Sequence, residues 1–388
     1  MKRLYLDNAA TSFPKPACVH QALIDYATKV GASAGRGAYD EAKESGRIIH
    51  HCRELIAKLI NAPDPDHIVM TFNCSDGLNM VIHGLVNPGD HVITTWMDHN
   101  SILRPFNELI SYLEIEADFI STQENGIVNV DDIRKAIKPN TKLIAVLHSS
   151  NVTGTVEPTA QIARLAREHG IYTLIDAAQS LGHWPIDVLA EGYDFLAAPG
   201  HKGLLGPLGT GFLYIRQGLE KVLRPFKQGG TGSRSEIMTQ PEIMPDKYEP
   251  GSHNAIGVAG LAKGVSYILD ETVEKIRRHD RALCERFMAG LDAVPKLTWF
   301  GPRDVENHVG VFSVRMEGYE PLELSQLLER DFGILTRSGL HCAPLAHKTI
   351  GTLDSGGTTR FSFGPFVTLD DIDYTVDALK TIASKPRR

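Results

Sequence analysis

The sequence has few cysteines, no long apolar run and no excess of basic residues, and each shortage excludes a class of protein. Its five cysteines among 388 residues are scattered and contain no C-x-x-C pair, which excludes a disulfide framework and favours a reducing, cytoplasmic location. A net charge of −7 argues against nucleic acid or an anionic membrane as the main partner. No segment approaches the roughly 18 uninterrupted apolar residues that a membrane helix needs.

Two further signals are missing. Asp7 and Asn8 interrupt the N-terminal segment MKRLYLDNAAT before an apolar stretch can form, so we expect no signal peptide. The glycine-rich segment 206–211 leads into a predicted strand and not into a helix. That order contradicts the dinucleotide-binding fingerprint and argues against an NAD-dependent oxidoreductase. With 42% hydrophobic and 22% charged residues, the composition is that of an ordinary globular protein.

Short apolar runs alternate with amphipathic segments between residues 67 and 215. The runs are rich in Val, Ile, Leu, Phe and Tyr and are bounded by Gly, Pro, Asn or Asp, which is typical of strands. The pattern predicts strands at His67–Phe72, His91–Thr95, Leu143–His148, Tyr172–Ile175, Phe195–Ala198 and Gly211–Ile215, and helices at Asp76–Leu85, Asp131–Ile137 and Thr159–Glu168. This is an α/β order, with a mostly parallel sheet, helices on both faces and functional loops at the carboxyl ends of the strands.

The rest of the chain has a different pattern. Residues 217–254 are polar and rich in Gly and Pro, so we expect long loops there. One long helical stretch, 255–293, follows. A strand at Val309–Arg315 and helices at Pro321–Phe332 and Asp370–Ile382 then predict a smaller α+β unit.

Two polar motifs directly follow predicted strands. NCSDG (73–77) opens a helix, whose free amide groups and dipole favour an anion, and Ser75 adds a hydroxyl. Ordinary N-capping by Asn73 or Ser75 is the alternative. Asp176 ends an apolar strand, where a carboxylate is costly unless it meets a cation; capping of the next helix is the alternative.

Three more residues have both a chemical and a structural interpretation. Lys202 lies in a glycine-rich loop, where burial would lower its pKa and expose a nucleophilic amine, although a lone loop lysine is more often solvent-facing. Cys342 lies beside His341 and near Arg337, whose positive charges would favour the thiolate, although most free cysteines are buried and inert. Arg360 suits a substrate carboxylate or, alternatively, a structural ion pair.

Together these residues supply the parts that hold pyridoxal phosphate and an amino acid. The sequence here resembles the cysteine desulfurases of the class V aminotransferase family. The resemblance rests on YLDNAAT (5–11), HSSNVTGT (148–155), IDAAQS (175–180), GHK (200–202) and RSGLHCA (337–343), and the short last loop resembles the group II branch. It implies the pyridoxal-phosphate-dependent transferase fold of type I. Residues 14–261 would form a large domain with a mostly parallel seven-stranded sheet, and 1–13 with 262–388 a small domain carrying the cysteine loop.

The resemblance also implies roles for individual residues. Lys202 matches the Schiff-base lysine, Cys342 the nucleophile that takes sulfur, and His99 the residue stacked on the ring. The residues that match cofactor ligands are Cys74, Ser75, Asp176, Gln179, His201 and, from a second subunit, Ser252. Asn151 and Arg360 match the ligands of the substrate carboxylate. No metal site is expected, because no second ligand pair with zinc-like spacing accompanies His341, Cys342 and His347.

The implied activity is that of a homodimeric enzyme that converts L-cysteine to L-alanine. Its sulfur would pass through a persulfide on Cys342 to an acceptor protein, for iron–sulfur cluster assembly or a related use. A selenocysteine lyase or another C–S lyase, independent of Cys342, is the alternative, and the presence of Lys202 disfavours a non-catalytic module. Pro199, Cys74 and Leu340 replace a Ser, a Thr and a His that are common in relatives, and the first two imply an altered phosphate cup.

Overall fold

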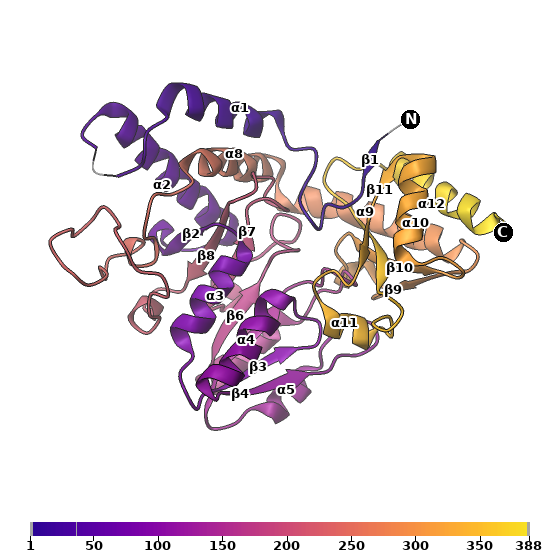
Figure 1. The fold of residues 1–388 in the computed structure, drawn as a ribbon, viewed down its shortest axis with the longest axis horizontal. Helices are drawn as coiled ribbons and strands as arrows, with labels where there is room; N and C mark the ends of the chain where they lie inside the picture. The colour runs from indigo at the N-terminus through magenta and orange to yellow at the C-terminus, as the bar shows by residue number, and fades with distance from the viewer. Residues whose placement is uncertain (1–2, 36, 386–388) are drawn as a thin grey trace.

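A computed structural model describes residues 3–35 and 37–385, and its centre is a seven-stranded sheet (Figure 1). The strand order is β2-β8-β7-β6-β5-β3-β4. The strands are β2 (Ile68–Thr71), β3 (His91–Thr95), β4 (Glu116–Ile120), β5 (Thr141–Leu147), β6 (Tyr172–Asp176), β7 (Phe195–Pro199) and β8 (Gly211–Ile215). Neighbours from β4 to β7 pair in parallel, whereas β8 is antiparallel to both β7 and β2. The predicted α/β fold with a mostly parallel sheet is confirmed.

Strand β4 is the one member of this sheet that the sequence pattern did not predict. It reads EADFI, and every residue in it is at least partly exposed. It lies at the edge and pairs only with β3. Charged residues are a common way to protect an exposed sheet edge, and they hide the apolar signal of the strand.

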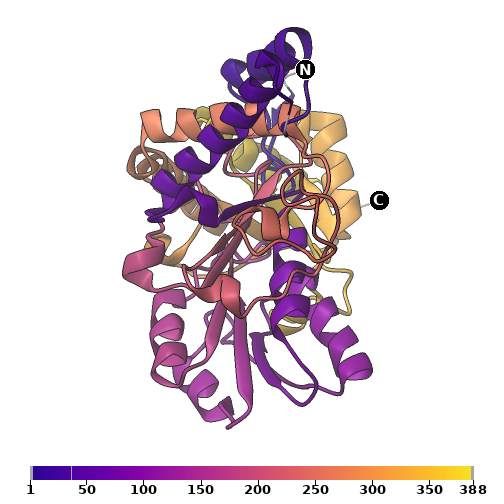
Figure 2. The ribbon, with the colours of Figure 1, turned by 90° about the vertical axis from the view of Figure 1, so that its left-hand side faces the viewer.

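Helices cover both faces of the sheet, as predicted (Figure 2). Alternate residues of one strand enter opposite apolar clusters; Leu143 packs with α3 (Cys74–Leu85) and α4 (Asn100–Leu113). Its neighbour Ile144 packs on the other face. The helices there are α2 (Asp40–Ile60), α6 (Thr159–Glu168) and α8 (Ala255–Glu271). Along the chain, α5 (Val130–Ala136) follows β4 and α7 (Val188–Glu191) follows β6. Helix α1 (Ala17–Asp25) contacts α8.

A second, four-stranded sheet follows near the C-terminus, with the order β12-β13-β10-β9. Its strands, β9 (Leu297–Phe300), β10 (Val311–Met316), β12 (Arg337–Gly339) and β13 (Thr358–Ser362), pair antiparallel. Strands β9, β10 and β13 share an apolar cluster with α9 (Val273–Asp292), α10 (Pro321–Phe332) and α12 (Leu369–Ser384). The short α11 (Pro344–Thr349) lies between β12 and β13. These elements form the right-hand part of Figure 1.

Two details differ from the sequence-based expectation or extend it. The stretch 255–293 is two helices, because Thr272 has a φ of 66° and its side chain caps α9. The N-terminal β1 (Leu4–Tyr5) pairs in parallel with β11 (Ile334–Leu335), which ties the start of the chain to its C-terminal part. The domain boundaries at 14 and 261 stay a prediction. Across residues 3–35 and 37–385, none of the helices is both long and apolar enough to cross a membrane.

Candidate active site

A cavity lies at the carboxyl ends of the parallel strands, where functional loops were expected. It gathers residues that follow β2, β3, β5, β6 and β7, because strands running in the same direction end at the same edge of the sheet. The cavity is lined by Asn73, Cys74, Ser75, His99, Ser101, Leu147, Ser149, Asn151, Asp176, Ala178, Gln179, Pro199, His201 and Lys202. The structure therefore brings together most of the site residues predicted from the sequence.

One end of the cavity suits an anion. Helix α3 starts there, and the Asn73 side chain accepts a hydrogen bond from the Asp76 amide at 2.9 Å. The capping and anion-binding interpretations of this motif are therefore compatible, since the first two amides of the helix have no intrahelical partner. Ser75 Oγ lies 2.5 Å from Ser101 Oγ. His201 Nδ1 is buried and has no partner among the described residues, so it has a hydrogen-bonding position to offer a ligand.

Asp176 and Lys202 are the charged pair of the cavity. Asp176 is 4% exposed, and its Oδ1 accepts hydrogen bonds from the Ala178 amide at 2.9 Å and from Cys74 Sγ at 3.3 Å. Lys202 is half-buried, and burial lowers its pKa while the carboxylate of Asp176 opposes that shift. Lys202 lines the cavity and is only partly exposed, and its lowered pKa gives it a larger fraction of neutral amine at neutral pH than an ordinary lysine has.

His99 is held as a neutral imidazole. It caps α4, and its Nδ1 accepts the Ser101 amide at 3.1 Å, which places the ring proton on Nε2. Burial lowers the pKa of His99 to about 4. His201 has a pKa lowered to about 4 by burial, followed by the charges of Lys202 and Lys15. Both imidazoles are uncharged at neutral pH. The His99 ring is suited to lie against an aromatic ring.

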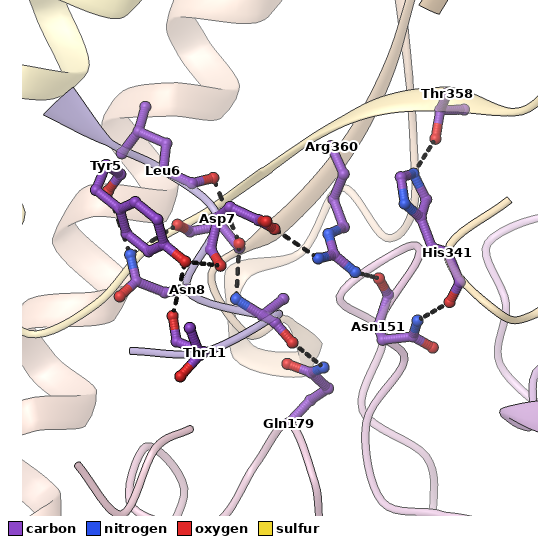
Figure 3. Close-up of polar contacts among 12 residues, drawn as sticks. Tyr5, Leu6, Asp7, Asn8, Thr11, Asn151, Gln179, His341, Thr358 and Arg360 are labelled. Atoms are coloured by element: carbon purple, nitrogen blue, oxygen red, sulfur yellow. Dashed lines mark hydrogen bonds and ion pairs between the residues drawn. The ribbon is translucent and has the colours of Figure 1, made fainter. Parts of the chain in front are cut away.

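Gln179 is positioned by the N-terminal segment. Its Nε2 donates to the Ala9 carbonyl at 3.0 Å, as Figure 3 shows. The same segment reaches the loop after β7, because the Ser12 amide donates to the His201 carbonyl at 2.9 Å. Hydrogen bonds from the N-terminal segment therefore fix the positions of two predicted cofactor ligands, Gln179 and His201.

Arg360 lies on β13 next to the cavity, and it is 1% exposed. Its Nη2 donates to Asp7 Oδ1 at 2.7 Å and its Nη1 to the Asn151 carbonyl at 3.2 Å (Figure 3). The structural ion pair foreseen as the alternative is therefore present. Arg360 Nε is buried without a hydrogen-bond partner among the described residues.

The Cys342 loop lies next to the same cavity, against its lining residue Asn151. Two of its backbone carbonyls accept hydrogen bonds. Asn100 N donates to the Cys342 carbonyl at 2.8 Å, and Asn151 Nδ2 donates to the His341 carbonyl at 2.7 Å. Cys342 itself is exposed, so the buried and inert alternative is wrong. His341 and Cys342 have φ values of 50° and 60°, an unusual left-handed pair that the surrounding hydrogen bonds maintain.

The expected positive charge of His341 is not present. Its side chain is buried, and burial, followed by the charge of Arg360, lowers its pKa well below the ordinary value. His341 Nε2 contacts Thr358 Oγ1 at 3.1 Å, Thr358 donates to Ser313 Oγ at 2.9 Å, and that hydroxyl donates to the Val152 carbonyl. This chain of donors fixes the ring proton on Nε2, so His341 orients the loop and adds no charge beside Cys342.

Ser252 does not join the cavity in this chain. It is exposed and lines a separate cavity with residues that include Phe72, Asp76 and Lys227. Sequence reasoning also missed residues. Ser101 follows His99 by two positions at a helix start, which is a recognisable capping pattern, whereas the pairing of Asp7 with Arg360 has no local signal.

The chain is similar to known proteins over nearly its whole length. The aminotransferase class-V family model matches residues 4–375. A "probable cysteine desulfurase" from Methanothermobacter thermautotrophicus is 34% identical, over 98% of this chain and 94% of the relative. The apo structure of a cysteine desulfurase from Thermococcus onnurineus NA1 has a TM-score of 0.92 at 33% identity, covering 98% of this chain and 94% of that one. A cysteine desulfurase structure from Escherichia coli has a TM-score of 0.87 at 28% identity, covering 97% and 94%.

Proposed function

Because the chain belongs to the aminotransferase class-V family, we propose that it is a pyridoxal-phosphate-dependent cysteine desulfurase that converts L-cysteine to L-alanine. The observation that carries the proposal is the position of Cys342. An exposed thiol lies in a loop whose backbone carbonyls accept hydrogen bonds from Asn100 and Asn151, and Asn151 lines the cavity together with Lys202 and Asp176. A C–S lyase that needs only the cofactor has no use for that arrangement.

The residues of the cavity fit pyridoxal phosphate. The phosphate would lie at the start of α3, with Ser75 and the unpartnered Nδ1 of His201 as donors. Asp176 would meet the ring nitrogen, Gln179 the ring hydroxyl, and His99 the ring face. Lys202 would hold the cofactor covalently through its amine. When bound, the cofactor supplies an electron sink that weakens the bonds at the substrate's α-carbon.

The chain's own residues would then bind the substrate and move its atoms. Arg360 Nε and the side chain of Asn151 would hold the carboxylate, and the Lys202 amine would take and return the proton at Cα. Cys342 Sγ would form a new S–S bond to the substrate sulfur as the Cβ–S bond breaks. The electron pair stays with carbon, which takes a proton and becomes the methyl group of alanine, and the persulfide remains on the enzyme.

The proposal includes partners. A second copy of the chain would bring its Ser252 to the phosphate, and an acceptor protein would take the sulfur from the exposed Cys342. The short loop favours the group II branch, and the expected location is the cytoplasm. Seleno-L-cysteine would be a second substrate, because selenium leaves carbon more readily than sulfur does.

The test is a paired assay of alanine and sulfide from L-cysteine, with a reductant present. We expect alanine from the wild type, and a loss of at least about 100-fold in Cys342→Ser, because removing a nucleophile removes the step it performs. Cys18→Ser is the matched control, since Cys18 is also exposed but lies on α1. Full alanine production by Cys342→Ser would contradict the proposal and favour the C–S lyase.

A further inference from the structure

We propose that the buried thiol of Cys74 is a positioning residue that holds the Asp176 carboxylate in the orientation needed by the cofactor's ring nitrogen. The inference rests on the proposed function. It assigns to Cys74 a contact with Asp176, whereas the sequence placed this residue only in the phosphate cup. Cys74 Sγ lies 3.3 Å from Asp176 Oδ1, which is within hydrogen-bond distance for sulfur.

The two oxygens of the Asp176 carboxylate differ in their hydrogen-bond partners. Oδ1 accepts two hydrogen bonds, one from the Ala178 amide at 2.9 Å and one from the Cys74 thiol. Among residues 3–35 and 37–385, no protein donor is found on Oδ2. With one oxygen occupied from two directions, the carboxylate cannot rotate freely, and Oδ2 remains available to a ring N–H in the cavity that Asp176 lines.

The thiol itself is held in place by the packing of α3. Cys74 is the first residue of that helix and is 7% exposed. One turn later, a Cβ atom at Gly77 would lie only 3.3 Å from the Cβ atoms of Ala197 and Leu213. The helix therefore lies against β7 and β8 with little room to shift. This close approach keeps Cys74 beside the end of β6, where Asp176 lies.

The protonation state of Cys74 is the one the contact needs. Burial, followed by the negative charge of Asp176, raises the pKa of Cys74 well above its ordinary value. The group is therefore a neutral S–H donor at working pH and not a thiolate that would repel the carboxylate. The neutral thiol donates to Oδ1, so the carboxylate keeps its negative charge for the ring nitrogen.

The test compares Cys74→Thr with Cys74→Val, two side chains of the same shape of which only threonine keeps a donor. Pyridoxal phosphate affinity and the pH titration of the bound cofactor's absorbance are measured in both. We expect the threonine variant to stay within about two-fold of the wild type and the valine variant to bind about five-fold more weakly, the effect of one hydrogen bond. The titration midpoint should move only in the valine variant. If the valine variant does not fold, Cys74→Ala takes its place in the comparison.

A second measurement needs no cofactor. The S–H stretching band of Cys74 is isolated as the infrared difference between the wild-type apoprotein and Cys74→Ala. In an Asp176→Asn background, with the charged acceptor gone, this band should move to higher frequency. Equal affinities and titrations for the threonine and valine variants, or a band that Asp176→Asn does not move, would overturn the inference. If the wild type takes up no pyridoxal phosphate, the proposed function fails instead, and the band still decides the contact.

Discussion

Arg360 is an ion-pair partner and, in the proposed function, also a substrate ligand. Its Nη2 already holds Asp7 at 2.7 Å, while its Nε has no partner among the described residues. A substitution at Arg360 therefore removes a donor for the substrate and also leaves the Asp7 carboxylate unpaired. The two effects must be separated before a loss of activity is assigned to substrate binding.

We expect Arg360→Gln to raise KM for L-cysteine by roughly 10–100-fold, since a hydrogen bond to a charged group contributes about 1.5–3 kcal/mol. The double variant Asp7→Asn/Arg360→Gln removes the ion pair as a whole. It should recover thermal stability relative to Arg360→Gln and keep the raised KM. A KM that returns to the wild-type value in the double variant would restrict Arg360 to its structural role.

Individual residues were predicted from the sequence where a local pattern surrounds them. Lys202 and Ser75 follow apolar strands, Asp176 ends one, and all three line the cavity. The partners of Arg360 and Gln179 were not predictable in this way. Asp7 is 353 positions from Arg360, and Ala9 is 170 positions from Gln179, so both contacts depend on the tertiary fold and leave no signal in the local sequence.

At the scale of elements, the Cys342 loop depends on its neighbours for its shape. Two successive non-glycine residues in the left-handed region cost on the order of 1–3 kcal/mol each, and this strain persists only where other contacts maintain it. The His341–Thr358 hydrogen bond and the two backbone contacts from Asn100 and Asn151 provide that support.

Thr358→Val should therefore loosen the loop and lower kcat by about 5–10-fold, because it removes the acceptor that orients His341. Thr359→Val is the matched control on the same strand. Thr359 is also buried and hydrogen-bonded, but to the Pro321 carbonyl. Alkylation of Cys342 by iodoacetamide is the structural readout, and its rate should change only in Thr358→Val. Equal changes in both variants would mean that the effect is general destabilisation.

The hydrophobic periodicity predicted which segments are helices and which are strands. Some of their first and last residues depend on local backbone conformation, which the periodicity does not reveal. The strands at His91–Thr95 and Gly211–Ile215 and the helix at Pro321–Phe332 were predicted with the correct bounds, because apolar runs coincide with their buried faces. The break at Thr272 was not predicted, since a threonine with positive φ leaves no mark in the hydrophobic pattern.

At the scale of the whole molecule, the proposed homodimer explains why Ser252 lies outside the cavity of its own chain. It lines a second cavity with Phe72, which is 57% exposed, and Gly209 of that cavity follows Leu208, which is 66% exposed. Large exposed apolar side chains beside a polar loop are suited to cover by another subunit.

Sedimentation should show a dimer for the wild type. Phe72→Glu with Leu208→Glu should yield monomers that bind pyridoxal phosphate more weakly, because each would place a charge in the subunit contact. Tyr112→Glu is the control, since Tyr112 is 79% exposed on α4 and does not line that cavity. A wild-type monomer that is loaded with cofactor and active would contradict the shared site.

The identity of the cysteine that receives sulfur is the most direct test of the proposed chemistry. The purified enzyme is exposed briefly to L-cysteine without reductant, digested, and analysed by mass spectrometry. We expect one added sulfur on the peptide that contains Cys342, the exposed thiol of the loop beside the cavity, and none on the buried Cys74. Alanine formation with no sulfur on Cys342, or with the added sulfur on Cys74, would contradict the assignment of Cys342 as the nucleophile.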